Sequence, residues 1–292
     1  MTEATDATQG GRASDRTGLR GSAAFGWAMI VAGLVAALAL LLGGQELAAR
    51  LPMKPPIMAL ILFYTVLFTP LALLGMVLGL IERRPILRGG RNPLRWAAIG
   101  LAVGVGGMGA AAGYVWLNGT MIPATSSEAF PGGTIALGLA ISVLTVGAEE
   151  ILFRGWLLSA FQDRVGAALA VVLSALAFSG FHVLGGAQAP LSLANLMLGG
   201  IWFALLAQRS GGLLAPFFAH LGWNVTEELG FGLVPGSEFH SLFNYDMVGA
   251  ALWGGSDEGL NASIAMSLVL VALIVPLLPV FSRSPKPAAI PH

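Results

Sequence analysis

Long apolar runs separated by short polar segments dominate the sequence, and they predict helices that cross a membrane. A run of about 20 apolar residues is long enough to span the hydrocarbon core of a bilayer as a helix. The runs, bounded by charged, glycine-rich or proline-rich segments, cover residues 25–42, 56–80, 96–117, 134–161, 166–184, 191–207, 213–229 and 262–281. The pattern therefore predicts an all-α, polytopic membrane protein with about eight transmembrane helices.

The two ends of the chain differ from this apolar domain, which we place at residues 25–281. Residues 1–24 are small and polar, which predicts a disordered tail, and residues 282–292 form a proline-rich tail. A signal peptide is the rival interpretation of the first apolar run. The long polar lead and the further spans that follow argue against it.

Composition agrees with a membrane protein and excludes several kinds of site. The 292 residues are 56% hydrophobic and 10% charged, whereas a soluble domain carries about 25% charged residues. The net charge is zero, which gives no indication of a nucleic-acid partner. Cysteine is absent, so disulfides, zinc–thiolate sites and a cysteine nucleophile are excluded.

The distribution of arginine predicts how the helices are oriented. Five arginines follow the second span, at positions 83, 84, 88, 91 and 95, and short basic loops stay in the cytoplasm. The N-terminal tail, two crossings away, is also basic. Residues 118–133 and 230–260 contain no Lys or Arg and fit the outside. We therefore expect both termini in the cytoplasm, and a multi-pass protein of a bacterial plasma membrane.

The fourth span contains the most unusual stretch of the chain. Glu149, Glu150 and Arg154 lie within six positions of an otherwise apolar run, and one ionised side chain at the bilayer centre costs roughly 2.5–3.5 kcal/mol. Glu150 and Arg154 are four residues apart on one helix face, so we expect them to form a structural ion pair. Glu149 is turned from Glu150 by roughly 100° and remains available as a working carboxylate.

Two further spans carry polar side chains at comparable depth. His182 follows Phe178 by four positions in the fifth span, so an aromatic ring should lie beside the histidine. His220 and Asn224 share a face of the seventh span. A rise of about 1.5 Å per residue places these groups and Glu149 roughly 12–26 Å from the cytoplasmic turns, inside the hydrocarbon core. We therefore predict a shared buried pocket.

A carboxylate facing two histidines and an amide suits two kinds of hydrolysis. Glu149 could act as a general base toward water, with His220 and Asn224 holding the water or stabilising the oxyanion. Alternatively, Glu149, His182 and His220 could bind Zn²⁺ or another divalent metal, which would lower the pKa of its bound water. The sequence has no His-Glu-x-x-His motif, so the standard zinc-protease pattern is absent.

The ordered motifs Glu149-Glu150-x-x-x-Arg154, Phe178-x-x-x-His182 and His220-x-x-x-Asn224 resemble those of the CPBP intramembrane protease family. This family includes CAAX prenyl endopeptidases and bacteriocin-processing proteins, and the resemblance covers about residues 134–230. It implies a membrane endopeptidase with a cavity reached from the cytoplasm. It assigns water activation to Glu149 and makes His182 a second acid/base or ligand group.

The implied partners are a peptide or protein substrate at the membrane and the lipid bilayer, and no nucleic acid. Two other functions fit the same residues. A non-catalytic binding or immunity protein of the family could keep the motifs, and a proton-coupled transporter could use buried carboxylates and histidines as a relay. The nearby Glu227 and Glu228 could reach either the outer membrane interface or the site itself, and we favour the interface.

Overall fold

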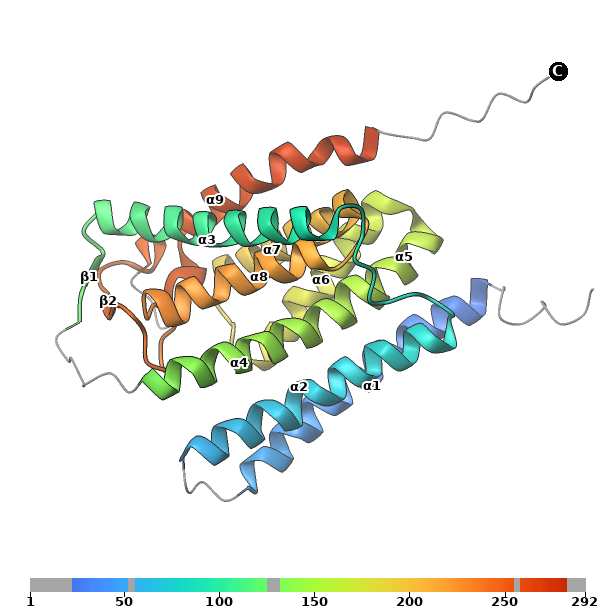
Figure 1. Cartoon of the computed structure of the whole chain (residues 1–292), viewed down its shortest axis with the longest axis horizontal. Helices are drawn as coiled ribbons and strands as arrows, with labels where there is room; N and C mark the ends of the chain where they lie inside the picture. The colour runs from blue at the N-terminus through green and yellow to red at the C-terminus, as the bar shows by residue number, and fades with distance from the viewer. Residues whose placement is uncertain (1–22, 52–55, 125–131, 255–257, 283–292) are drawn as a thin grey trace, which may run out of the picture.

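Helices make up nearly all of the structure, as the apolar runs predict (Figure 1). The structure is a computed structural model, and it describes residues 23–51, 56–124, 132–254 and 258–282. The long helices are α1 (Ala23–Ala49), α2 (Pro56–Ile81), α3 (Pro93–Leu117), α4 (Gly132–Glu149), α6 (Ala167–Leu184) and α7 (Pro190–Ser210). The shorter ones are α5 (Leu158–Val165), α8 (Leu214–Val225) and α9 (Ile264–Ile274).

The remaining elements are short. Two π-helical segments, Glu150–Leu157 and Thr226–Gly230, continue α4 and α8 directly. Three 3₁₀ segments cover Ala251–Trp253, Gly259–Ala262 and Val275–Ser282. Two strands, β1 (Met121–Pro123) and β2 (Tyr245–Met247), pair antiparallel with Ile122 opposite Asp246.

Six helices of the described chain are long and apolar enough to cross a membrane. The protein is therefore a multi-pass integral membrane protein with an all-α fold. The other two predicted spans are shorter: α8 with its π-helical end covers Leu214–Gly230, and the last apolar helix covers Ile264–Pro279. The apolar pattern alone does not show whether short helices of this kind lie inside the bundle or cross it obliquely.

Several predicted boundaries change. The fourth span continues to Val165, and the turn lies at Gly166, whose positive φ of 79° suits glycine. Residues 162–165, which lie between two of the predicted spans, are therefore helical. Of the predicted N-terminal tail, residues 23 and 24 begin α1, and residues 1–22 lie outside the described part. The C-terminal tail lies outside it from residue 283 onward.

The arrangement of loops agrees with the predicted sidedness. The two segments without basic residues, 118–133 and 230–260, meet at one end of the bundle, where β1 pairs with β2. Figure 1 shows that the first helix begins and the last one ends at the opposite end, beside the arginine-rich loop between α2 and α3. The assignment of either end to the cytoplasm stays a prediction.

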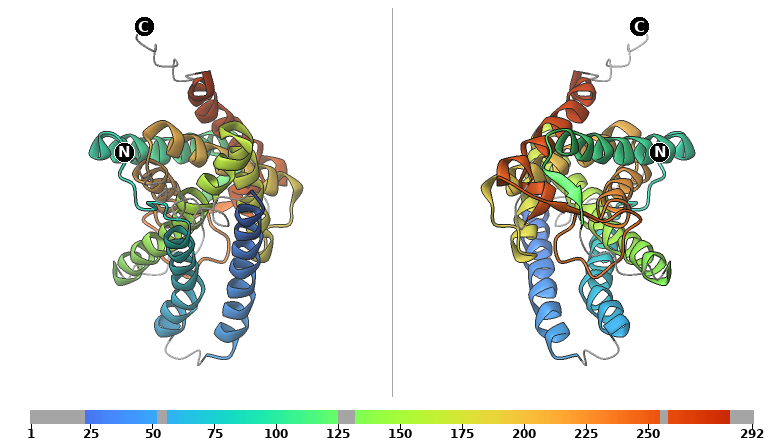
Figure 2. Two further views of the ribbon diagram at one scale, coloured as in Figure 1. Left: turned by 90° about the vertical axis from the view of Figure 1, so that its right-hand side faces the viewer. Right: turned by 90° about the vertical axis from the view of Figure 1, so that its left-hand side faces the viewer.

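Small residues allow the closest helix contact in the bundle. A Cβ atom at Gly100 or Gly104 of α3 would collide with the backbone of α8 at Ala215 and Ala219. Small residues four positions apart allow helices to approach this closely. Gly109 and Gly113, spaced in the same way on α3, have no described atom within 4 Å of where a Cβ would lie, so they take no part in this contact. Figure 2 shows the other long hairpin, α1–α2, at the edge of the bundle.

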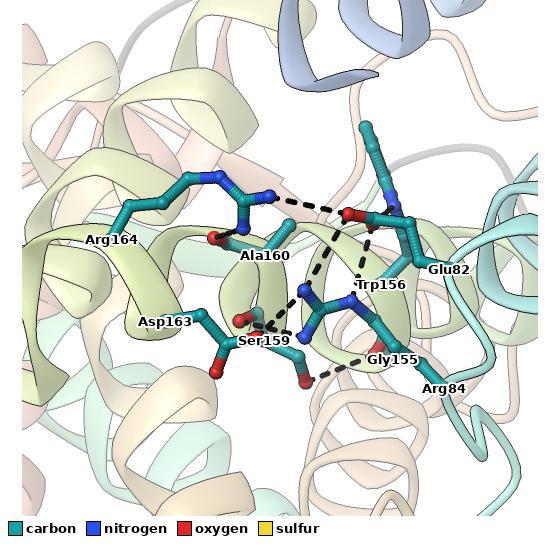
Figure 3. Close-up of polar contacts among 8 residues, drawn as sticks. All are labelled: Glu82, Arg84, Gly155, Trp156, Ser159, Ala160, Asp163 and Arg164. Carbon is teal, nitrogen blue, oxygen red and sulfur yellow. Dashed lines mark hydrogen bonds and ion pairs between the residues drawn. The ribbon is translucent and has the colours of Figure 1, made fainter. Parts of the chain in front are cut away.

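A group of charged side chains joins the α2–α3 loop to α5 at the arginine-rich end (Figure 3). We call it the loop cluster: Glu82, Arg84, Trp156, Asp163 and Arg164. Glu82 Oε2 accepts a hydrogen bond from Trp156 Nε1 at 2.7 Å and pairs with Arg84 Nε at 3.2 Å. Its other oxygen lies 3.5 Å from Arg164 Nη2. Arg84 also pairs with Asp163 at 2.8 Å.

Candidate active site

One continuous helix, α4 followed by the π-helical segment Glu150–Leu157 and α5, carries the two glutamates and the arginine. The segment is wider than an α-helix because Leu158 N–H bonds to the carbonyl of Phe153, five residues back. A π-helical turn reduces the angle between successive side chains, and such turns are frequent at functional sites. Adjacent residues here can therefore face one partner.

Glu150 is the most buried acid of this helix, with 1% of its surface exposed. Its Oε1 lies 3.1 Å from Arg154 Nη1, which confirms the predicted ion pair. The same oxygen lies 3.0 Å from Nδ1 of His220, a contact that the sequence did not predict. Arg154 Nη2 donates a hydrogen bond to the carbonyl of Gly200 at 3.3 Å, and the guanidinium carbon lies 4.3 Å from the centroid of the Phe178 ring.

His220 lies between the two glutamates. Its Nδ1 contacts Glu150, and its Nε2 is 3.7 Å from Oε2 of Glu149. A separation of 3.7 Å is too long for a direct hydrogen bond. The imidazole stacks on Phe203, with ring centroids 4.4 Å apart and planes inclined by 22°. Glu149 was expected to point away from Glu150, but both carboxylates approach this one histidine.

His182 is held in a defined orientation near the end of α6. Its Nδ1 lies 2.8 Å from the carbonyl oxygen of Phe178. Because a carbonyl only accepts, Nδ1 carries the hydrogen and Nε2 is left for other partners. The ring of Phe178 lies 4.5 Å from the imidazole centroid, as the four-residue spacing predicts.

A cavity of about 250 Å³ brings the predicted residues together. Its wall includes all four candidate catalytic residues: Glu149, His182, His220 and Asn224. They come from α4, α6 and α8, the three helices that correspond to the predicted fourth, fifth and seventh spans. The shared buried pocket is therefore confirmed, whereas the catalytic roles of its residues stay predictions.

Two acids that sequence reasoning assigned elsewhere also line this cavity. Glu227 and Glu228, expected at the outer membrane interface, belong to the cavity wall, and Glu227 is 5% exposed. Both lie in the second π-helical segment, directly after α8. The signal was in the sequence: Glu227 follows Asn224 by three positions and His220 by seven, which places all three on one helix face.

Asn195 of α7 was also missed, and its contacts identify it as a structural residue. Its amide nitrogen donates to the carbonyls of Asn261 at 2.8 Å and Ser263 at 2.9 Å. Its amide oxygen accepts from Ser267 at 2.6 Å. These bonds tie α7 to the start of α9 and fix this side of the cavity.

The cavity reaches the end of the bundle that carries the acidic loops. Val234 and Asn261, from the segments that flank the strand β2, belong to its wall. The arginine-rich loop lies at the opposite end (Figure 1). The resemblance implies that the cavity is reached from the cytoplasm, whereas the charge bias places the arginine-rich loop in the cytoplasm. These two expectations therefore assign the cytoplasmic side to opposite ends of the molecule.

The side chains do not gather into an evident metal centre. Among the described residues, no three His, Asp or Glu side chains are placed so that they could hold one metal ion together. The suggested ligands Glu149, His182 and His220 line one cavity. They are not, however, placed close enough together to hold one metal ion. We therefore derive no chemical step through a metal.

Comparison with known proteins connects this site to a family. The family model described as "Rce1-like: Type II CAAX prenyl endopeptidase Rce1-like" matches residues 131–226, the segment that contains all three motifs. No curated protein and no solved structure matches the chain significantly. The family match confirms the resemblance drawn from the motifs. The match covers about a third of the chain, and it relates this segment to the CAAX-type membrane endopeptidases.

Proposed function

We propose that this protein is an intramembrane endopeptidase that hydrolyses a peptide bond of a membrane-associated or lipidated substrate with water activated by Glu149. The family match supports a membrane protease in general terms. One observation supports the mechanism above all others: Glu149 faces Nε2 of His220 at the cavity wall, while Glu150 binds the opposite ring nitrogen.

The hydrogen bonds around His220 define where a water molecule would bind. Because a carboxylate only accepts, the contact of Nδ1 with Glu150 assigns the ring hydrogen to Nδ1. Nε2 of the neutral ring is then an acceptor, and it faces the Glu149 carboxylate, which is also an acceptor, at 3.7 Å. A water molecule can donate one hydrogen to each, and its lone pairs remain free for attack.

The chemical step uses Glu149 twice. The water oxygen bonds to the substrate carbonyl carbon while its proton passes to the Glu149 carboxylate. The C–N bond then breaks, and Glu149 returns that proton to the leaving nitrogen. Asn224 and His182 line the same cavity and would stabilise the oxyanion that forms between these steps.

Replacing Glu149 by glutamine tests this proposal directly. Glu149→Gln keeps the size of the side chain but removes its basicity, so we expect peptide cleavage to fall at least about 10²-fold, since general-base catalysis contributes about 10²–10⁴. The substrate mixture is a library of lipidated peptides, with the purified full-length protein in lipid nanodiscs and products identified by mass spectrometry. Glu46→Gln is the matched control, because Glu46 is exposed and pairs only with Arg50 in the described structure.

Normal cleavage by the Glu149→Gln protein would refute the assignment. A cellular phenotype that survives the same substitution would favour the non-catalytic binding function instead. Proton-driven uptake into vesicles that Glu149→Gln abolishes would favour a transporter.

Chelation separates the two ways of activating water. Glu149, His182 and His220 would have to hold the metal, whose chemistry would be to lower the pKa of a bound water. Carboxylate catalysis predicts that dialysis against EDTA leaves the cleavage rate unchanged. A rate that falls with EDTA and returns with one divalent metal would contradict our mechanism while leaving the peptidase function intact.

A further inference from the structure

The carboxylate of Glu227 is buried in the cavity wall without a partner from the described protein. The residue is 5% exposed and lines the cavity. No hydrogen bond or ion pair connects its side chain to another described residue, whereas the neighbouring Glu228 accepts one from Ser237 Oγ at 2.6 Å. A buried carboxylate is costly unless a cation or a hydrogen-bond donor approaches it.

The backbone holds this carboxylate in place. The carbonyl of Glu227 accepts a hydrogen bond from Leu233 N–H at 2.9 Å, and the carbonyl of Leu229 accepts one from Leu242 N–H at 2.7 Å. These bonds join the π-helical segment to the loop that follows it. The side chain is therefore presented by a fixed turn, as a binding residue needs to be.

The charge of the cavity wall is uniformly acidic. Glu149, Glu227 and Glu228 line it, and among the described lining residues there is no Lys or Arg. Trp223 lies four residues before Glu227 on the same helix face and also belongs to the wall. Aromatic faces and carboxylates together attract ammonium and guanidinium groups.

We propose that Glu227, with Trp223 and Glu228 beside it, forms a subsite that binds a basic side chain of the peptide substrate. The inference rests on the proposed peptidase function, because it names the substrate chemistry of the same cavity. In this arrangement the substrate supplies the cation that the protein does not place beside Glu227. The subsite would align the peptide relative to Glu149, which lines the same cavity.

The test measures binding, so that it does not depend on cleavage. The probes are N-palmitoylated, C-terminally amidated octapeptides of alanine and leucine that carry one lysine at each position in turn. Each has a partner with norleucine in place of lysine, which has a similar chain but no charge. We expect lysine at one position to bind the full-length Glu149→Gln protein in nanodiscs about tenfold more tightly than norleucine, a typical gain from a charge-assisted contact.

A second substitution tests which acid is responsible. Glu149→Gln with Glu227→Gln should lose the preference for lysine, and Glu149→Gln with Glu227→Asp, which keeps the charge, should retain part of it. Glu238→Gln is the matched control, because Glu238 lies in the loop that follows the π-helical segment, is exposed and does not line the cavity. This control should keep the full preference.

Three results would overturn the subsite: no lysine preference at any position, a preference that survives Glu227→Gln, or an equal loss of binding for lysine and norleucine peptides. The first is measured on the Glu149→Gln protein alone, so it does not depend on whether the Glu227 variants fold. Failure of the proposed function is recognised separately, because a wild-type protein that cleaves none of these peptides can still show the binding preference.

Discussion

Two groups of charged side chains lie along the same long helix, and they place their charges in different surroundings. The loop cluster, near the end of α5, surrounds the Glu82 carboxylate with an indole and two guanidinium groups (Figure 3). The second group, which we call the pocket cluster, comprises Glu149, Glu150, Arg154 and His220. Its Glu150 is buried and is paired with Arg154, but its Glu149 and His220 border a cavity.

This difference indicates that the loop cluster serves stability and the pocket cluster serves function. In the loop cluster both oxygens of Glu82 are engaged by protein groups, and the contacts join the α2–α3 loop to α5. In the pocket cluster, Glu149 is 3.7 Å from the nearest ring nitrogen of His220, a distance that leaves both groups available to a third molecule. A glutamate–arginine pair in a membrane helix is therefore not in itself an indication of catalysis.

Labelling of single cysteines should place the two ends of the bundle on opposite sides of the membrane, which is an all-or-none result. The chain has no cysteine, so Leu87→Cys and Leu242→Cys each introduce one thiol. Both leucines are exposed, at 66% and 69%, at the arginine-rich end and the acidic-loop end. From the charge bias we expect a membrane-impermeant maleimide to label Leu242→Cys in spheroplasts and Leu87→Cys only in inverted vesicles.

The reverse labelling pattern would place the cavity end in the cytoplasm. It would support the access implied by the family resemblance and disprove the orientation predicted from arginine. Labelling of both thiols from one side would contradict a membrane-crossing arrangement of the bundle.

Sequence reasoning predicted the helical fold and the contributors to the cavity, because both depend on local patterns. Apolar runs fix helix length, and spacings of four residues fix which side chains share a face, as the pairs Glu150–Arg154 and Phe178–His182 show. Helix ends were less predictable. Arg164 seemed to mark a loop, yet it is partly buried at the end of a helix beside Glu82, a partner 82 positions away in the chain.

The contacts of His220 with both glutamates could not be predicted from α-helical geometry. They involve a π-helical turn that begins at Glu150, directly after Glu149 ends α4. Apolar periodicity does not reveal such turns. Glu227 was misplaced for a related reason. Two adjacent acids near the end of a span suggest solvent, and only the tertiary fold shows that the following loop returns over the cavity.

Glu150→Gln should have the largest effect on stability. It removes the ionised partner of Arg154, whose side chain is fully buried, and breaking a buried pair costs about 3–5 kcal/mol. For a protein of this size, thermal unfolding in detergent should occur at least roughly 6 °C lower, at about 2–4 °C per kcal/mol. Adding Arg154→Met should recover much of this loss, because the unpaired cation is removed, but not peptide cleavage.

An unchanged unfolding temperature for Glu150→Gln would show that the pair does not stabilise the helix. Recovery of cleavage together with stability in the double variant would show that the contact between Glu150 and His220 is dispensable. Either result would argue against the different roles that we assign to the two clusters.

Glu82→Gln should destabilise the protein by a smaller amount. Its partners Arg84 and Arg164 are 16% and 14% exposed, so water can solvate both guanidinium groups when the carboxylate is lost. We expect a loss of about 1–3 kcal/mol, the usual range for hydrogen bonds to a charged group. Peptide cleavage per folded molecule should stay at the wild-type rate, measured under conditions in which both proteins are folded. A loss of cleavage without a loss of stability would contradict the structural role that we assign to the loop cluster.

Asp163→Asn should have the smallest effect, although it interrupts the shortest ion pair of the loop cluster. Asp163 is 61% exposed, and its 2.8 Å contact with Arg84 competes with water and salt. Exposed pairs contribute about 0–1 kcal/mol, so on the same scaling the unfolding temperature should change by no more than roughly 4 °C. Because Debye screening acts on exposed charges, this difference should vanish in about 1 M salt. The loss caused by Glu82→Gln, at a buried carboxylate, should persist there, and equal salt sensitivity of the two variants would contradict the buried position of Glu82.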